Sequence, residues 1–181
     1  MLKHESIPAE TVALTLGDGT PAVIRPLVPT DEAKLVEGLQ RLSPESRIRR
    51  FLFEKSTFTP GEIQHLAHPD GCTQIALVLA ILNEMGQEVD KVAVARCFRN
   101  PQESQFGEVA VATVDEWQGL GIGTALIKQL ARCCRQHGIL YWVATLFSGN
   151  TPMRKLLQRV GGEVFRETIG ASVVQETYEL R

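Results

Sequence analysis

The sequence predicts an α/β fold in which a mixed sheet carries helices on both faces, giving three layers. Apolar runs of strand length, such as residues 73–82 and 140–147, recur along the chain. Amphipathic segments lie between some of these runs, and the longest covers residues 121–137. No linker-like tract interrupts the chain, so we expect residues 1–181 to form one domain.

Turn and capping residues predict the first elements. Asp-Gly at residues 18–19, between apolar runs at residues 11–16 and 22–25, indicates a β-hairpin. Thr30 or Asp31 is expected to cap a first helix. Three helices are expected here: one to about residue 42, a short one from residue 44, and one over residues 60–67.

The rest of the chain alternates strands and helices. Strands are expected over residues 73–82, 91–99, 106–114, 140–147, 163–168 and 172–179. Residues 83–90 are polar and contain a glycine, which favours a turn. A helix is expected over residues 121–137, and another should begin at Asn150 or Thr151 and end at residues 161–162.

Charge and hydropathy narrow the class of protein. The net charge of -2 gives no global electrostatic reason to expect nucleic acid or an anionic membrane as partner. No apolar run reaches the roughly 18–20 residues of a membrane span. The N-terminus shows no apolar core of a signal peptide. We expect a cytoplasmic monomer or homodimer that binds neither nucleic acid nor membrane.

Neither a metal site nor a disulfide is expected. His65 and His68 are three residues apart with Asp70 nearby, but no matching further ligand is evident, so solvated helix-end histidines are favoured. The four cysteines lack C-x-x-C spacing, which favours reduced thiols. A covalent acyl-cysteine route is the alternative, without a local His–Cys signature.

The strongest motif is a glycine-rich loop between a strand and a helix. Residues 117–123 are Trp-Gln-Gly-Leu-Gly-Ile-Gly. Glycines let the backbone approach a ligand, and the first amides of a helix favour anions, so the loop predicts a pyrophosphate site. The alternating glycines differ from the dinucleotide spacing G-x-G-x-x-G, and no Gly-Lys-Ser/Thr follows. A plain strand-to-helix turn is the structural alternative.

Residues 118–123 resemble the Arg/Gln-x-x-Gly-x-Gly/Ala signature of the GNAT superfamily of N-acetyltransferases. The resemblance covers nearly the whole chain, and residues 24–27, 42–46 and 108–110 are similar to the GNAT domains of bacterial protein-lysine acetyltransferases. It implies a GNAT-like α/β/α fold with a mixed, mostly antiparallel sheet, and acetyl-CoA as co-substrate.

The resemblance also implies cofactor contacts. Loop amides would bind the pyrophosphate, and the preceding strand would pair with the pantetheine arm. The residues assigned to the cofactor are Val111, Ala112, Thr113, Gln118, Gly119, Leu120, Gly121, Ile122, Gly123, Thr124, Asn150 and Met153. The alternative for Val111 is an ordinary core residue, which is compatible with cofactor contact through its backbone. For Asn150 a helix cap is an equally good explanation, and one asparagine can do both.

Amine acylation needs a neutral amine, whereas a free lysine has a pKa of about 10.4. A carboxylate can remove that proton. By resemblance Glu108 is the general base, and a solvated strand-start residue is the alternative. Asp115 and Glu116 are rival carboxylates on the loop side. A backbone amide of residues 110–114 would stabilise the oxyanion.

The chain departs from the family pattern at two places, and one is Gly161-Gly162 in place of the usual Gly-Phe ending. The other concerns the general acid. Many members carry a tyrosine seven residues after the asparagine that Asn150 matches, as general acid for the thiolate, and Leu157 stands there instead. A coenzyme thiol has a low enough pKa to leave as thiolate. Nearby charge is also open to interpretation: Arg47, Arg49 and Arg50 could meet the cofactor's 3′-phosphate, an acidic partner, or only solvent.

The sequence thus predicts an enzyme that moves acetyl from acetyl-CoA directly to a primary amine. By subfamily resemblance the acceptor is a protein lysine, and a small amine is the runner-up. A non-catalytic acyl-CoA-binding regulatory module is the second hypothesis, supported by Leu157. A nucleotide-phosphate-binding protein is the third.

Overall fold

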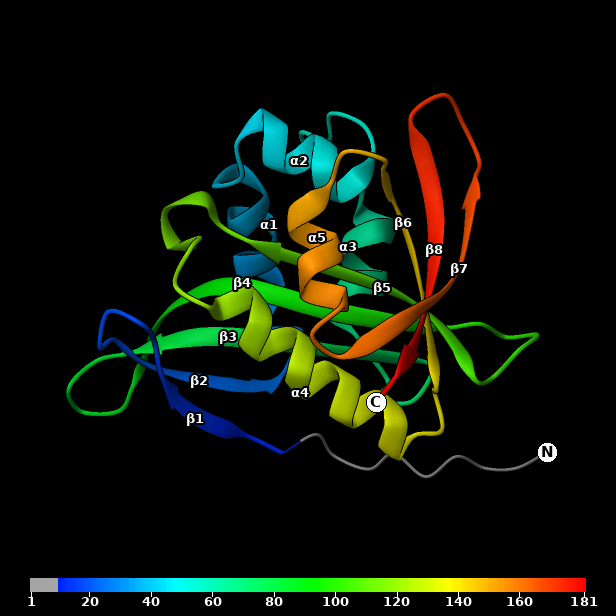
Figure 1. Ribbon diagram of the computed structural model, residues 1–181. Helices are drawn as coiled ribbons and strands as arrows, with labels where there is room; N and C mark the ends of the chain where they lie inside the picture. Colours follow the sequence, from blue (N-terminus) through cyan, green and yellow to red (C-terminus); the bar gives the residue numbers. More distant parts are fainter. Residues whose placement is uncertain (1–9) are drawn as a thin grey trace.

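The computed structural model describes residues 10–181, and one eight-stranded sheet runs through it (Figure 1). The strand order is β1-β2-β3-β4-β5-β6-β8-β7. Neighbouring strands are antiparallel except β5 and β6, which are parallel. The strands are β1 Val12–Thr15, β2 Pro21–Pro26, β3 Gln74–Leu82, β4 Glu88–Arg99, β5 Phe106–Thr113, β6 Tyr141–Phe147, β7 Gly161–Thr168 and β8 Val173–Leu180.

Helices cover both faces of the sheet, which confirms the predicted three layers (Figure 1). One face carries α1, α2 and α3, and the other carries α4 and α5. The helices are α1 Glu32–Gln40, α2 Pro44–Phe51, α3 Pro60–Ala67, α4 Ile122–Gln136 and α5 Thr151–Leu157. Two 3-10 turns, η1 Pro29–Asp31 and η2 Asp115–Trp117, precede α1 and the glycine-rich loop.

The short helices begin at the residues that the sequence predicts. Ser43 Oγ accepts from the Ser46 amide at 3.2 Å, which caps α2. Thr59 caps α3 in the same way, and the Glu62 side chain accepts from the Thr59 amide at 2.8 Å to complete a capping box. Gly138, with a φ of +75°, follows the end of α4.

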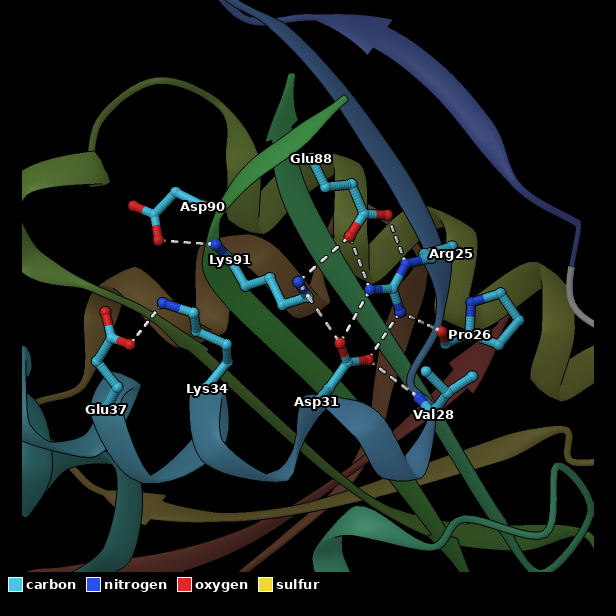
Figure 2. A network of polar contacts seen from close by, with 9 residues as sticks. All are labelled: Arg25, Pro26, Val28, Asp31, Lys34, Glu37, Glu88, Asp90 and Lys91. Atoms are coloured by element: carbon cyan, nitrogen blue, oxygen red, sulfur yellow. Dashed lines mark hydrogen bonds and ion pairs between the residues drawn. The ribbon is translucent and has the colours of Figure 1, made fainter. Parts of the chain in front are cut away.

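Asp31 has a different partner from the one expected. It stands before α1, but its carboxylate does not bond an α1 amide. It accepts two bonds from the Arg25 guanidinium, at 2.7 and 2.9 Å, and one from the Val28 amide at 3.1 Å. Figure 2 shows this carboxylate between Arg25 and Lys91, so an ionic network joins β2, β4 and the start of α1.

Two predicted boundaries are wrong. Strand β4 begins at Glu88 rather than residue 91, because the turn is shorter: Asn83 Oδ1 accepts from the Met85 and Gln87 amides. Helix α5 ends at Leu157, and Gly161 already belongs to β7. A Cβ at Gly161 would lie 2.3 Å from the Glu179 carbonyl oxygen of β8, so this glycine allows strand contact rather than ending the helix.

The main core lies between the sheet and α4. Leu126, Ile127 and Leu130 of α4 are fully buried against β3, β4 and β5. Burying each such side chain contributes about 1.5–3 kcal/mol relative to exposure. This packing fixes the axis of α4, and therefore the position of the loop that opens it. No helix within residues 10–181 has the length and apolar character of a membrane span.

Candidate active site

Strands β5 and β6 pair over only part of their length. Their parallel ladder joins Phe106, Gly107 and Glu108 to residues 141–143 of β6 and ends at the Glu108–Val143 pair. On its other edge β5 stays paired with β4 as far as Thr113. Beyond Glu108 the edge of β5 that faces β6 is therefore open to a ligand that can pair with a backbone.

The glycine-rich loop lies at the end of this open edge and leads into α4. Gly121 is the N-cap of α4, and no side chain caps the helix. The amides of residues 119–124 donate no hydrogen bond within residues 10–181, while the Ala125 amide bonds Gly121. Six consecutive unpaired amides, at the positive end of a helix dipole, form a cradle suited to an anion.

The three alternating glycines serve two purposes. Gly119 and Gly121 have φ values of +82° and +84°, a region that favours glycine. Gly123 is already helical, and a Cβ there would lie 3.3 Å from Leu156 Cδ1. The first two glycines therefore shape the loop, whereas the third lets α4 approach α5 closely.

One cavity of about 620 Å³ contains nearly all of the residues singled out from the sequence. It is lined by Glu108, Val111, Ala112, Thr113, Gln118, Gly119, Gly121, Ile122, Gly123, Thr124, Asn150 and Met153. Leu120 does not line it and packs against the core instead. Because the Ile122 side chain is buried in the core, its backbone faces the cavity.

Asn150 combines the two roles that the sequence left open. Its Oδ1 accepts from the Met153 amide at 3.2 Å, which caps α5. It also lines the cavity opposite the open edge of β5, because α5 follows β6. The cap therefore holds this amide at the cavity wall.

Glu108 is the one carboxylate among the described residues that line the cavity, and its side chain is exposed. The rival carboxylates lie outside this lining. Glu116 forms an ion pair of 2.5 Å with Arg41. Asp115 accepts from the Ser43 amide and from the Gln118 side chain, both at 3.3 Å. Both rivals therefore have a structural partner outside the cavity lining, Arg41 for Glu116 and Ser43 for Asp115.

No tyrosine takes up the position of a general acid. Leu157 is fully buried in the core, and its neighbour Leu156 faces the cavity instead. Among residues 10–181, no tyrosine, histidine, lysine or cysteine lines the cavity. Its ionisable side chains are Glu108 and the arginines Arg49, Arg50 and Arg159.

The basic cluster of α2 divides into three environments. Arg47 donates to the carbonyls of Leu42 at 2.9 Å and Gln40 at 3.2 Å. Arg49 pairs with Glu45 at 2.6 Å near the surface. Arg50 is half-buried and lines the cavity, and burial lowers its pKa to about 10 although the Glu108 charge opposes that shift.

Sequence reasoning missed several lining residues, namely Ser46, Phe51, Leu52, Trp117, Thr145, Pro152, Leu156 and Arg159. These come from α2, η2, β6 and the α5 region, which meet only in the folded chain. The sequence places Arg50 in a basic cluster, but its position in the sequence does not distinguish it from the exposed Arg49. Four of the eight residues of α2 are charged and three of these are arginines, so charge alone does not indicate which arginine interacts with Glu108.

The histidines and cysteines show no metal or disulfide chemistry in the described part. His65 stacks on the Phe98 ring with centroids 5.6 Å apart, and His68 Nδ1 lies 2.8 Å from the Gln64 carbonyl oxygen. No group of three metal-ligating side chains occurs within residues 10–181. The cysteines, all within this part, form no disulfide.

Comparison with known proteins identifies the family. Residues 44–162 match the model of the acetyltransferase (GNAT) family, so the chain belongs to this family. The match contains β3 to β6, the glycine-rich loop and α5. The predicted family, fold class and acyltransferase activity are thereby confirmed.

Two relatives carry acetyltransferase names. Acetyltransferase PA5475 of Pseudomonas aeruginosa is 32% identical over 147 residues, which are 81% of this chain and 77% of that protein. Acetyltransferase Pat of Mycolicibacterium smegmatis is 27% identical over 152 residues, 84% of this chain. The match spans only 44% of the Mycolicibacterium protein, so this chain corresponds to part of that longer protein.

Solved structures share the fold. The GNAT domain of S. lividans PAT has a TM-score of 0.79 at 24% identity, covering 94% of this chain and 97% of that one. The structure of yncA from Salmonella typhimurium, solved with its cofactor acetyl-CoA, has a TM-score of 0.67 at 15% identity, covering 88% and 93%. Acetyl-CoA is the co-substrate of the family, and the chain is an acetyl-CoA-dependent N-acetyltransferase.

Proposed function

We propose that the chain transfers acetyl directly from acetyl-CoA to a primary amine, with Glu108 as the general base, and that residues 1–181 act as one domain. The observation that carries the proposal is the cavity lining: one carboxylate, Glu108, lies where the β5–β6 ladder ends. A base at this point would face both the open strand edge and solvent.

The cofactor is proposed to follow the open edge of β5. The cradle of free amides would hold the pyrophosphate, and the backbone beyond Glu108 would pair with the pantetheine amides. This assigns cofactor contact to Val111, Ala112 and Thr113, to residues 118–124 and to Asn150 and Met153. Leu120 and Ile122 would contribute through the backbone, because Leu120 packs on the core and Ile122 is buried.

The chemistry needs one proton removed from the amine and one charge stabilised on the acyl oxygen. Glu108 takes the proton from the attacking amine. A free amide of β5 beyond Glu108 can donate to the oxyanion of the tetrahedral intermediate. The C–S bond then breaks and the coenzyme leaves as thiolate, which fits a cavity lining without a tyrosine or histidine.

The acceptor is proposed to be a lysine side chain of a protein, with a small amine as the alternative. The exposed side chain of Glu108 supports an acceptor that reaches in from the surface. The segments similar to bacterial protein-lysine acetyltransferases support the same class. The regulatory module remains a competing proposal, supported by the buried Leu157 in place of a tyrosine.

Replacement of Glu108 tests the proposal. Glu108→Gln keeps the shape of the side chain and removes its basicity, so we expect kcat for thiol release with a lysine peptide to fall about 10²- to 10⁴-fold. The affinity for acetyl-CoA, measured by calorimetry, should stay within twofold. The loss should shrink as pH approaches the amine pKa of about 10.4, because solvent then supplies the neutral amine.

Glu116→Gln is the matched control, because Glu116 is a nearby carboxylate that pairs with Arg41 and lies outside the cavity lining. It should retain wild-type turnover. Unchanged turnover in Glu108→Gln, with acetyl-CoA affinity intact, would overturn the assignment of the base. Acetyl-CoA binding without thiol release from any amine, before and after the substitution, would favour the regulatory module.

A further inference from the structure

A second, smaller cavity adjoins the first on the α1–α3 face of the sheet. It encloses about 80 Å³ and shares four lining residues with the larger cavity: Leu42, Arg50, Phe51 and Ala112. Most of its wall is aliphatic or aromatic. Its charged lining residues are Asp31, Lys34, Lys91, Arg50 and Arg96. The first three have ion-pair partners: Asp31 pairs with Lys91 and Lys34 with Glu37, which leaves the guanidinium groups of Arg50 and Arg96.

Arg96 of β4 is a buried cation without a carboxylate partner in the described part of the chain. It is 3% exposed. Its Nη1 donates to the Leu66 carbonyl at 2.6 Å and, with the Gln74 amide oxygen turned towards it, to Gln74 Oε1 at 3.0 Å. Its Nε and Nη2 donate to no group within residues 10–181. The hydrogen bonds of the Arg96 side chain therefore use only Nη1 of its three nitrogens.

Arg50 brings a second positive charge to the same place. Its guanidinium lies 4.7 Å from the Phe51 ring centroid and forms no ion pair within residues 10–181. The Arg50 charge and burial both lower the pKa of Arg96, to about 10, with burial the larger cause. The charge of Glu108 acts on Arg50. The group thus carries two positive charges against one negative charge.

The strand register places Arg96 close to Glu108. Across the β4–β5 ladder Arg96 lies opposite Ala110, and Phe98 lies opposite Glu108. Directly opposed residues share a face of the sheet, so Arg96 is the diagonal neighbour of Glu108. The small side chain of Ala110 stands between them on β5 and leaves room in the cavity.

Other buried ions in the protein are compensated. The Asp31 carboxylate is held by Arg25 and Lys91. Glu176, which is fully buried, accepts from Arg154 at 2.7 Å and Arg166 at 2.9 Å. A buried charge without a partner is costly, and the fold avoids it at both of these positions. The arginine pair is the exception, at the edge of the cavity that binds substrate in the proposed function.

We propose that Arg50 and Arg96 form a carboxylate subsite next to Glu108. The proposal rests on the proposed function, and it adds that one of the two substrates carries a carboxylate close to the reacting atoms. A guanidinium binds a carboxylate through paired N–H donors, and the free Nε and Nη2 of Arg96 form such a pair. The carboxylate belongs either to the amine acceptor or to the far end of the acyl group.

Two pairs of substrates distinguish a carboxylate on the amine acceptor from a carboxylate on the acyl group. L-lysine and cadaverine differ by the acceptor carboxylate, and succinyl-CoA and butyryl-CoA differ by the carboxylate of the acyl chain. We expect the wild-type enzyme to prefer the carboxylate member of one pair in kcat/KM. Arg50→Gln should reduce that preference roughly 10- to 100-fold by raising KM, since charged hydrogen bonds are worth about 1.5–3 kcal/mol. The member without carboxylate should lose much less, so the ratio of the two kcat/KM values falls.

Arg132→Gln is the control for charge, because Arg132 lies on α4, on the opposite face, and pairs with Glu10. Arg96→Lys is the second variant: it keeps the positive charge and loses the paired donors, so it should lose preference while remaining folded by circular dichroism. Calorimetric binding of L-lysine and cadaverine to the CoA-loaded protein gives the same comparison without turnover.

Equal kcat/KM and equal binding within both pairs in the wild-type enzyme would overturn the subsite. An equal loss for both members of a pair in Arg50→Gln would also overturn it, because it would show a general structural role. Neither result touches the proposed function, which is tested separately by the turnover of Glu108→Gln and by thiol release from acetyl-CoA with an amine. A carboxylate preference in binding without thiol release would support the subsite and contradict the proposed function.

Discussion

Gly107 has no room for a side chain, because Cys97 of the neighbouring strand lies against it. A Cβ at this position would lie 2.4 Å from Cys97 Sγ, 3.3 Å from Ile139 Cγ2 and 3.4 Å from the Phe98 carbonyl oxygen. Favourable contact between heavy atoms begins at about 3.5 Å, so Sγ or the strand must move by roughly 1 Å. Cys97 is fully buried and has no free space to enter.

We therefore expect Gly107→Ala to lower the free energy of unfolding by about 1–3 kcal/mol, the usual cost of overpacking. Gly107 pairs with Trp142 and directly precedes Glu108, so the displaced strand should also reduce turnover. Urea unfolding followed by circular dichroism measures the first effect, and thiol release measures the second.

Removal of the sulfur should rescue the variant. Cys97→Ala creates the space that the new methyl group needs, so Gly107→Ala/Cys97→Ala should be more stable than the sum of the two single effects, with a coupling energy of about 1 kcal/mol or more. Full stability of Gly107→Ala, or strict additivity in the double variant, would refute the argument from the Cys97 contact.

Two further substitutions test the fold and the cradle. Asp31→Asn should destabilise the protein at neutral pH by about 1.5–3 kcal/mol, because it removes the charged hydrogen bonds between Asp31 and Arg25, while Arg25 keeps its pair with Glu88. Burial raises the pKa of Asp31, but the bonds from Arg25 and the Val28 amide outweigh burial and hold the pKa below the ordinary 3.8. The stability that the Asp31 charge contributes is therefore present above pH 3.8 and is lost on acidification below it. The unfolding free energies of wild type and variant, measured against pH, should converge in acid. Gly121→Asp places a negative, β-carbon-bearing residue at a φ of +84° in the cradle, so calorimetry should show loss of CoA binding, and unchanged affinity would refute the cradle.

Much of the fold could be predicted from local chemistry. Ser43 and Thr59, each followed by proline, begin α2 and α3 as expected, because a cap and a fixed φ act within one helical turn. The Asp-Gly hairpin and the strand–loop–helix unit were likewise found from short-range signals. These elements depend on residues that are close in sequence.

The remaining features depend on partners far away in the chain. Thr30 or Asp31 was expected to cap α1, but the Asp31 carboxylate is held by Arg25 and no side chain caps the helix. Gly161 was expected to end a helix, whereas the close Glu179 carbonyl explains it. The partial pairing of β5 with β6 and the inward position of Arg50 follow from how strands and α2 assemble. No periodicity in the sequence encodes such contacts.

Thiol release by the wild-type protein tests the central claim most directly. The protein is mixed with acetyl-CoA, and release of the coenzyme thiol is followed before and after addition of a lysine peptide or a small amine. Mass spectrometry then records the intact mass of the enzyme and of the amine product. Direct transfer predicts release only after the amine is added, an acetylated amine as product, and no acetyl group on the enzyme. Tight binding of acetyl-CoA without release in the presence of any amine, or an acetylated enzyme that forms before the amine is added, would contradict it.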